Sequence, residues 1–346
     1  MLKHDARRFS VAPMMEWTDR HCRRFHRQFT RRAMLYTEML TANALIHGDP
    51  ERWLKHDPAE YPLALQLGGS EPDALHRAVV IARSYGFAEI NLNVGCPSDR
   101  VQNGAFGACL MREPELVADC VAAMIEAAAG RPDINGSEAA GPEITVKCRI
   151  GVDEQDPEVV LPAFMDRVAA AGVRAFAVHA RKAWLKGLSP KENRTVPPLD
   201  YDLVRRVRAE RPDLEIALNG GIETLDDAAA HLAEFDGVMI GRAAYHNPCG
   251  VLAGVDRRVF GENRPDADPV AAIRAMYPHI EAEVEAGTRL HQITRHMLGA
   301  FAGRPGARRW RRILSDGAPL PASQTPPAAI ALIEDALAAV RPAHAA

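Results

Sequence analysis

One cysteine in a constrained loop is the residue of this sequence with the clearest capacity for chemistry. Cys96 lies between Gly95 and Pro97 in the stretch NLNVGCPSDRVQNGAFGACL, just past an apolar run typical of a strand. Its thiol could serve as a nucleophile, a metal ligand or a general acid. Metal binding is disfavoured because the nearest cysteine, Cys109, is 13 residues further on, and nucleophilic use requires an unusually acidic thiol. A thiol that is protonated at neutral pH suits a proton donor.

Polar groups and glycine turns also follow the other apolar runs. In chain order they are Pro13-Met14-Met15, Glu38, Gln66, Asn91 with Asn93, Lys147 with Arg149, His179 with Arg181, Asn219-Gly220-Gly221 and Gly241-Arg242. The amide of Gln66, the ammonium of Lys147 and the imidazole of His179 would suit the N1/O2 edge of a flavin, where negative charge builds up on reduction. Each of these residues taken alone is as well explained by a solvated strand end.

Two glycine turns, LNGGI and IGRAA, follow the last two apolar runs of this series. Backbone N–H groups in such turns can bind a phosphate, and Arg242 could add charge-assisted hydrogen bonds to it. The alternative is that the glycines only permit tight turns. Their position on two successive strands favours a phosphate site.

Two segments are rich in arginine and contain no acidic residue. Arg20–Arg32 carries six arginines, and Thr288–Ser315 carries seven, at positions 289, 295, 304, 308, 309, 311 and 312. The run RRWRR places Trp310 among guanidinium groups, a pairing that can contact phosphates and stack on bases. A charge run usually marks a solvated helix face, but such faces normally mix both signs. The second segment therefore predicts nucleic-acid binding.

The elements that would position these residues alternate between short apolar runs and helical patterns. Strands are predicted at Phe9–Ala12, Leu35–Glu38, Leu63–Leu67, Glu89–Asn93, Ile144–Cys148, Ala175–His179, Glu215–Leu218 and Gly237–Ile240, and helices at Pro72–Tyr85, Glu113–Ala128, Glu158–Ala171, Tyr201–Glu210 and Thr224–Glu234. Eight such units predict an α/β fold, a (β/α)8 TIM barrel with its functional groups at the carboxyl ends of the strands. A doubly wound open sheet is the alternative, but no G-x-G-x-x-G follows the first strand.

The chain changes character after the predicted barrel. Gly261–Pro269 is rich in turn formers, and the segments after it show helical patterns only, at Pro269–Glu285, Gln292–Ala302, Arg308–Leu314 and Pro326–Val340. We therefore predict a catalytic barrel over residues 1–260 and a small all-helical domain over 261–320, extending to about 340. The turn-rich stretch Gly130–Glu143 predicts a solvent-exposed loop before the fifth strand.

The composition is that of an ordinary globular protein of 346 residues, with 47% apolar and 25% charged side chains. The net charge of -3, from 42 basic and 45 acidic residues, argues against a surface that binds polyanions throughout, but not against a local basic face. Six cysteines without a CxxC pair indicate neither a disulfide framework nor a zinc site. We therefore expect no bound metal. Because no signal peptide or membrane span is visible, we expect a soluble cytoplasmic protein.

Longer motifs resemble those of one known family. They are APMMEWTDRHCRRF, LNVGCPSDRVQNGAFGACLM, VKCRIGVD, VHARKAWLKGLSPKENRTVPPLDY, NGGI, DGVMIGRAAYHNP and RHMLGAFAGRPGARRWRR. In order and spacing, from about Phe9 to Leu314, they are similar to the A subfamily of the tRNA-dihydrouridine synthases. The resemblance implies an FMN-binding barrel and a helical domain that together reduce the C5–C6 bond of D-loop uridines at tRNA positions 20 and 20a, with NADPH as reductant. It implies no membrane and no protein partner.

The resemblance also implies roles for individual residues. Cys96 matches the family's proton donor. The FMN contacts would be Pro13, Met14, Met15, Gln66, Lys147, His179, Asn219, Gly220, Gly221, Gly241 and Arg242, and the positions associated with tRNA are Asn93, Lys191, Arg194, Arg308 and Arg311. Two other hypotheses are an FMN barrel that acts on a small molecule and an RNA-binding module without catalysis. The arginine-rich helical segment argues against the first, and Cys96 with the full flavin set argues against the second.

Overall fold

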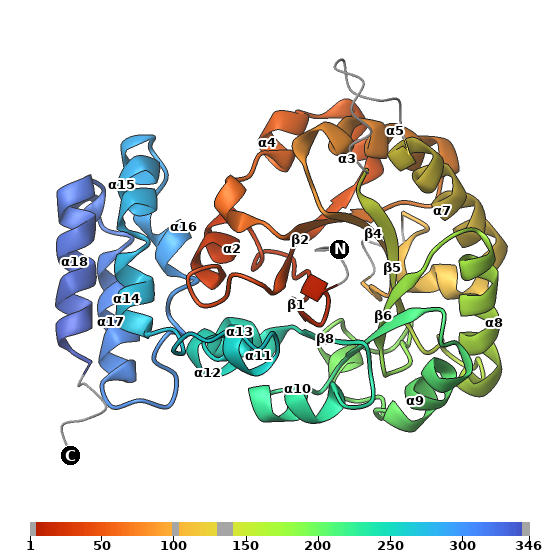
Figure 1. Ribbon diagram of the computed structural model, residues 1–346. Coiled ribbons are helices and arrows are strands. Elements are labelled where there is room, and N and C mark those ends of the chain that lie inside the picture. The colour runs from red at the N-terminus through yellow and green to blue at the C-terminus, as the bar shows by residue number, and fades with distance from the viewer. Residues whose placement is uncertain (1–4, 99–103, 130–140, 341–346) are drawn as a thin grey trace.

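Eight parallel strands form a closed barrel in the computed structural model, which describes residues 5–98, 104–129 and 141–340 (Figure 1). The strands are β1 (Phe9–Val11), β2 (Met34–Thr41), β3 (Leu63–Gly68), β4 (Glu89–Val94), β5 (Glu143–Arg149), β6 (Ala175–His179), β7 (Glu215–Asn219) and β8 (Gly237–Ile240). Each strand pairs with the next one along the chain, and β1 also pairs with β8, which closes the barrel. The predicted TIM barrel is confirmed, with every predicted strand in its place.

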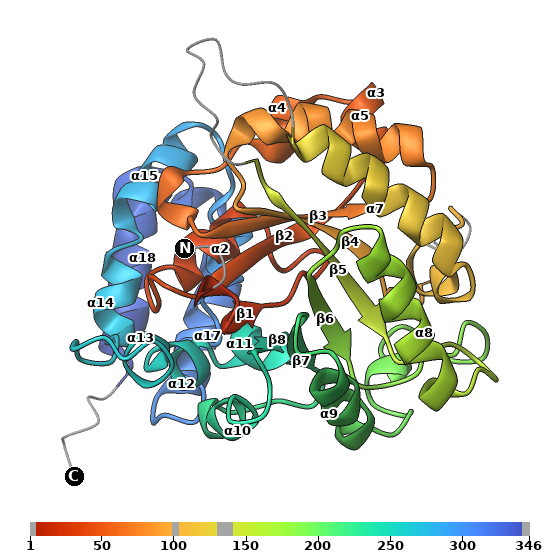
Figure 2. The ribbon, with the colours of Figure 1, turned by 45° about the vertical axis from the view of Figure 1, so that its right-hand side comes forward.

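Helices surround the barrel (Figure 2). They are α2 (Arg20–His26), α3 (Ala42–His47), α4 (Pro50–Leu54), α5 (Pro72–Ala82), α7 (Pro114–Ala129), α8 (Pro157–Ala170), α9 (Tyr201–Glu210), α10 (Leu225–His231), α11 (Arg242–His246), α12 (Pro248–Leu252) and α13 (Val255–Arg258). In α9 the apolar positions Leu203, Val204 and Val207 are buried, and Asp200 caps the helix by accepting the N–H of Leu203. The predicted helices between the strands are confirmed, with boundaries that differ by a few residues. Most of the predicted loop at Gly130–Glu143 lies outside the described residues.

An ion network fills the amino-terminal end of the barrel. The guanidinium of Arg7, which is 5% exposed, lies 2.6 Å from Glu215, 2.8 Å from Glu143 and 3.4 Å from Glu89. These three glutamates are the first residues of their strands, so they meet at one rim. Because this end is closed by side chains, a functional site belongs at the carboxyl ends of the strands.

A group of helices lies beside the barrel, at the left of Figure 1. It contains α14 (Pro269–Arg274), α15 (Tyr277–Glu285), α16 (Leu290–Thr294), α17 (Ala307–Gly317) and α18 (Pro326–Ala338), with α15 and α17 both packed against α18. The single helix predicted over Pro269–Glu285 is wrong, because Pro278 has no N–H to continue α14. The predicted helix Gln292–Ala302 ends at Thr294. Gly299 beyond it packs so closely on the carbonyl of His246 that a Cβ would lie 2.5 Å from the oxygen.

Asp19 joins the barrel to this helical group. Its Oδ1 caps α2 by accepting the N–H groups of His21 and Cys22, each over 3.0 Å, and its Oδ2 lies 2.7 Å from Arg295 and 2.9 Å from His296. Burial raises the pKa of the Asp19 carboxyl, but the hydrogen bond and charge of His296 outweigh it and hold the pKa below its usual range. The division into domains at residue 260 stays a prediction. Within the described ranges, no helix is both long and apolar enough to span a membrane.

Candidate active site

Three buried amides form a row at the carboxyl ends of β3 and β4. Gln66 donates from Nε2 to Asn91 Oδ1 over 2.9 Å, and Asn93 donates from Nδ2 to Gln66 Oε1 over 2.8 Å. Asn91 in turn donates to the hydroxyl of Thr145 on β5 over 2.7 Å. These bonds fix the orientation of each amide. Asn93, predicted to contact tRNA, is buried at the carboxyl end of β4, and its contact with tRNA stays a prediction.

The Cys96 loop, which we define as Gly95–Ser98, begins directly after β4. Asn93 Oδ1 accepts the N–H groups of Gly95 and Cys96, each over 3.0 Å, and the carbonyl of Cys96 accepts the N–H of Ala108 over 2.9 Å. The thiol is partly buried and lies 3.5 Å from the hydroxyl of Ser98. The backbone on both sides of Cys96 is thus held, and the thiol is presented from a fixed position.

Lys147 lies two residues before the end of β5, and His179 and Asn219 are the last residues of the neighbouring strands β6 and β7. Lys147 Nζ donates to Asn219 Oδ1 over 3.1 Å, and Asn219 Nδ2 donates to the carbonyl of Met239 over 2.7 Å. Burial and the charge of Arg149 lower the pKa of Lys147 to about 8. Burial and the same neighbouring cations hold the pKa of His179 well below its usual value, so its imidazole is neutral. The buried Nδ1 of His179 has no hydrogen-bond partner among the described residues.

The glycine turn after β7 has a backbone that other residues adopt with difficulty. Gly220 and Gly221 have φ values of +104° and +73°. A Cβ on Gly221 would lie 2.5 Å from both Leu199 and the hydroxyl of Tyr201, which donates to the carbonyl of Gly220 over 2.6 Å. The turn is therefore held in one conformation, with no room for a side chain.

The turns after β1 and β8 meet beside it. A Cβ on Gly241 would lie 3.5 Å from Met14 Sδ, so the Met14 side chain packs against the backbone of Gly241. Pro13 and Met14 are partly buried, whereas Met15 and Arg242, the first residue of α11, are exposed. The turns after β1, β7 and β8 thus supply backbone groups, the exposed guanidinium of Arg242 and the apolar side chains of Met14 and Met15.

These features fit a flavin mononucleotide. A buried imidazole nitrogen with no partner among the described residues can bond to a ligand, a cation at Lys147 can balance negative charge, and the exposed backbone of Gly221 could bind a phosphate. Gln66, Lys147, His179 and Asn219 are the residues that would hold the ring, and the turns at Gly220-Gly221 and Gly241-Arg242 would hold the phosphate. The roles of Pro13, Met14 and Met15 stay predictions.

Two basic residues lie on the loop that follows β6. Lys191 and Arg194 are exposed on the loop after β6, at the ends of a short 3-10 turn. Burial and the charge of Arg242 lower the pKa of Arg194, and Cys96 is also within its electrostatic range. Arg149, which the sequence reasoning placed at a strand end without a role, lies buried beside the same loop.

An aromatic contact links this face to the helical group and was missed from the sequence. Trp17, after β1, stacks on Tyr245 of α11 with ring centroids 4.4 Å apart and an angle of 14°. The hydroxyl of Tyr245 lies 3.1 Å from His296 Nδ1, and His296 contacts Asp19. The contact joins residues more than 200 positions apart, so no local pattern could have revealed it.

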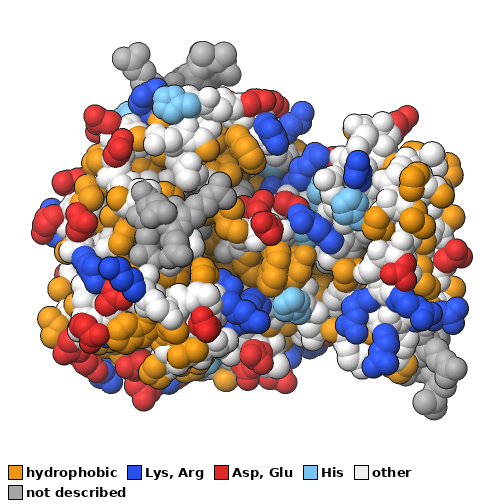
Figure 3. Space-filling view, turned by 180° about the vertical axis from the view of Figure 1, so that it is seen from behind, with side chains coloured by type: hydrophobic (Ala, Val, Ile, Leu, Met, Phe, Trp, Pro, Cys, Tyr) orange, Lys and Arg blue, Asp and Glu red, His pale blue; other side chains and the backbone are white. Residues whose placement is uncertain are grey.

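The second arginine segment is exposed, but its tryptophan is not. Arg308, Arg309, Arg311 and Arg312 all face solvent on α17, and Figure 3 shows Lys and Arg side chains gathered on the lower part of the helical group. Trp310 is 0% exposed, donates from Nε1 to the carbonyl of Met297 over 3.1 Å and packs edge-on against Phe301. The prediction that this ring could stack on a base is wrong, because it belongs to the helical core.

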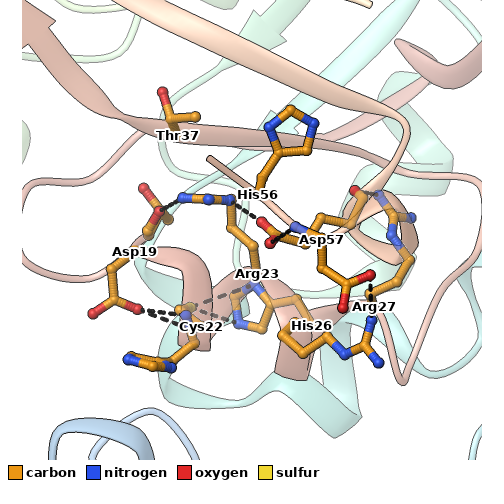
Figure 4. A network of polar contacts seen from close by, with 12 residues as sticks. Asp19, Cys22, Arg23, His26, Arg27, Thr37, His56 and Asp57 are labelled. Carbon is orange, nitrogen blue, oxygen red and sulfur yellow. Dashed lines mark hydrogen bonds and ion pairs between the residues drawn. The ribbon is translucent and has the colours of Figure 1, made fainter. Parts of the chain in front are cut away.

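The first arginine segment, Arg20–Arg32, has partners from distant parts of the chain. Arg23 pairs with Glu60 over 2.6 Å, Arg24 with Asp57 over 3.0 Å, and Arg20 with Glu283. Figure 4 shows Arg23, Arg27 and Asp57 within this network of polar contacts. The absence of acids within this segment therefore does not make it a free basic face.

Comparisons with known proteins cover nearly the whole chain. The family model "Dihydrouridine synthase (Dus)" matches residues 10–335. The tRNA-dihydrouridine(20/20a) synthase of Escherichia coli strain K12 is 55% identical over 316 residues, covering 91% of this chain and 88% of that protein. The protein of the same name from Yersinia pestis is 52% identical over 343 residues, covering 99% and 94%. The one from Xanthomonas axonopodis pv. citri is 54% identical over 330 residues, covering 95% and 93%.

Proposed function

The chain belongs to the dihydrouridine synthase family, and from this premise we propose that it reduces the C5–C6 bond of the D-loop uridines at tRNA positions 20 and 20a. The product is 5,6-dihydrouridine, tightly bound FMN is the cofactor, and NADPH is the reductant. The names of relatives at 52–55% identity support the substrate and its positions. The observation that carries the proposal is the fixed thiol of Cys96 at the same barrel end as the Lys147, His179 and Asn219 cluster.

FMN supplies, when reduced, the hydride that C6 of the uracil receives. The chain's residues hold that cofactor in place. Gln66 is fixed by its bonds to Asn91 and Asn93, so it offers its amide in one orientation. Lys147 would offer a positive charge to a flavin that becomes negative on reduction, and neutral His179 would offer it a ring nitrogen.

Cys96 completes the reduction by giving its proton to C5 of the uracil, and the thiolate regains a proton from solvent. The loop places the thiol so that a base lying over the barrel mouth meets it without movement of the backbone, since Asn93 and Ala108 already fix that backbone.

Binding of tRNA is assigned to the basic residues on two elements. Lys191 and Arg194 border the mouth, and Arg308 with Arg311 lies on the exposed side of α17. The target uridine must leave its stack to enter the barrel, at a cost of a few kcal/mol. Contacts between arginines and tRNA phosphates offset that cost.

The purified protein itself tests the cofactor assignment. It should be yellow and carry about one FMN per chain, released on denaturation and identified by its mass. With NADPH and tRNA lacking dihydrouridine, it should form dihydrouridine in the D-loop. A colourless protein that neither binds added FMN nor modifies tRNA would refute the proposal.

A further inference from the structure

Arg149 ends β5 and connects two loops of the candidate active site. Its side chain is 4% exposed. Its Nε donates to the carbonyl of Gly95 over 3.1 Å, and one terminal nitrogen donates to the carbonyls of Asn193 over 2.9 Å and Lys182 over 3.3 Å. Burial lowers its pKa only to about 10, so the guanidinium keeps its charge at neutral pH.

One end of this connection is the peptide that leads into Cys96. Asn93 holds the N–H groups of Gly95 and Cys96, and Ala108 holds the carbonyl of Cys96. The carbonyl of Gly95 is bonded by Arg149. Loss of that bond would leave the peptide directly before the thiol held on one side only, through the N–H of Cys96 on Asn93, and its unpartnered carbonyl could then tilt toward another donor.

The other end is the loop after β6, which carries Lys191 and Arg194. Asn193 lies between them and is fully buried. Its amide donates to the carbonyls of Trp184 and Leu188 over 2.9 Å and 3.1 Å and accepts the N–H of Trp184 over 2.7 Å. The loop is therefore compact. Because Arg149 bonds to the carbonyl of Asn193, it holds the backbone that carries Lys191 and Arg194.

We propose that Arg149 is a positioning residue that fixes the Cys96 loop relative to the loop of Lys191 and Arg194. The proton donor then keeps a constant distance from a base whose strand is held by that second loop. A planar fork with several donors can satisfy carbonyls from both loops at once, whereas a lysine offers a single point of charge. The inference rests on the proposed function for the reaction it serves, but the geometry can be tested without it.

The test is the variant Arg149→Lys, loaded with FMN. Because a misplacement of about 1 Å can cost on the order of 100-fold in rate, we expect a 10- to 100-fold lower kcat for dihydrouridine formation, with the KM for tRNA changed by less than about threefold. In the absence of tRNA, the rate at which iodoacetamide alkylates Cys96, followed by peptide mass spectrometry, should change at least about threefold, because thiol access depends on the loop. Asn193→Ser, which loosens the other end of the connection, should change both quantities in the same direction.

Arg27 offers a matched control. It is 8% exposed, its pKa is lowered by burial to about 10, and it also donates to backbone carbonyls, those of Thr30, Ala33, Glu60 and Pro62. Arg27→Lys should therefore reduce stability in a similar way while leaving kcat and Cys96 alkylation as in the wild type.

Unchanged alkylation of Cys96 in both Arg149→Lys and Asn193→Ser would overturn the inference. A lower kcat in Arg149→Lys would then reflect direct contact of Arg149 with the substrate instead of a displaced thiol. An equal change in Arg27→Lys would overturn it too. Wild-type protein that forms no dihydrouridine would refute the proposed function instead, and the alkylation rates would still decide the role of Arg149.

Discussion

The side-chain oxygen of Asn93 accepts the backbone N–H of Cys96 over 3.0 Å, which ties the thiol to the end of strand β4. The same Asn93 donates to Gln66 over 2.8 Å, so the tie extends to β3. The position of the thiol is consequently set by two barrel strands, although Cys96 itself lies in a loop. Substitution of the thiol can thus be separated from disturbance of its surroundings.

Cys96→Ala removes the proton donor and leaves these backbone bonds in place. We expect FMN content and tRNA affinity within about twofold of the wild type and a turnover lower by about 10²- to 10⁴-fold, the usual contribution of a general acid. Dihydrouridine per tRNA over time, measured by nucleoside mass spectrometry, gives the turnover. Cys249→Ala removes another partly buried thiol, on α12, and serves as the control. Full turnover in Cys96→Ala would remove the role assigned to this residue.

Gly221→Ala tests the turn assigned to the phosphate of FMN. The added Cβ meets Leu199 and Tyr201 at 2.5 Å in a backbone with φ of +73°, so we expect lost FMN and a free energy of unfolding lower by about 1–3 kcal/mol. Gly261→Ala is matched in backbone, with φ of +69°, but its Cβ would have no neighbour within 4 Å. The control should lose some stability and keep its FMN. Equal FMN content in both variants would contradict the assignment.

The affinity for FMN should depend on pH through Lys147. Burial, with the charge of Arg149, lowers its pKa to about 8, so the side chain is charged below that pH and neutral above it. If its charge helps to hold the cofactor, affinity measured by flavin fluorescence should fall as the pH rises from 7 to 9. In Lys147→Met the affinity should be lower and show no such fall. The same pH dependence in that variant would mean that another group is responsible.

The arginines of α17 should govern the salt dependence of tRNA binding. Arg308→Glu with Arg311→Glu should weaken binding and reduce the slope of log affinity against log salt concentration by about 1.4–1.8, roughly 0.7–0.9 for each of two lost phosphate contacts. Arg167→Glu with Arg206→Glu changes the net charge equally on the outer helices α8 and α9, where these arginines pair with Glu115 and Glu158. Filter binding at several salt concentrations compares the two. Equal slopes in both double variants would refute the assignment to α17.

Much of the fold and of the site was predictable because it depends on local patterns. Apolar runs give the strands, and in a parallel barrel the last residues of all strands lie at the same end, which places Gln66, Lys147 and His179 at one end of the barrel. The burial of Trp310 also had a local signal, since Ala307, Trp310 and Leu314 are spaced as one helix face.

Other features depend on hydrogen bonds and ion pairs between residues that are far apart in the sequence. The partners of Arg23 and Arg20 come from a loop 37 residues away and from α15, so an acid-free segment looked like a free basic face. The role of Arg149 depends on the carbonyls of Gly95 and Asn193. Every residue has a backbone carbonyl, so such contacts cannot be recognised from the residue types of the partners. Pro278 did carry a signal, and its effect on α14 follows from its missing N–H.

The most direct test of the central claim is to map dihydrouridine in tRNA from cells that lack this protein. We expect uridine in place of dihydrouridine at positions 20 and 20a, and we expect the wild-type chain to restore the modification while Cys96→Ala does not. Dihydrouridine at both positions in cells without the protein, or full restoration by Cys96→Ala, would contradict that claim.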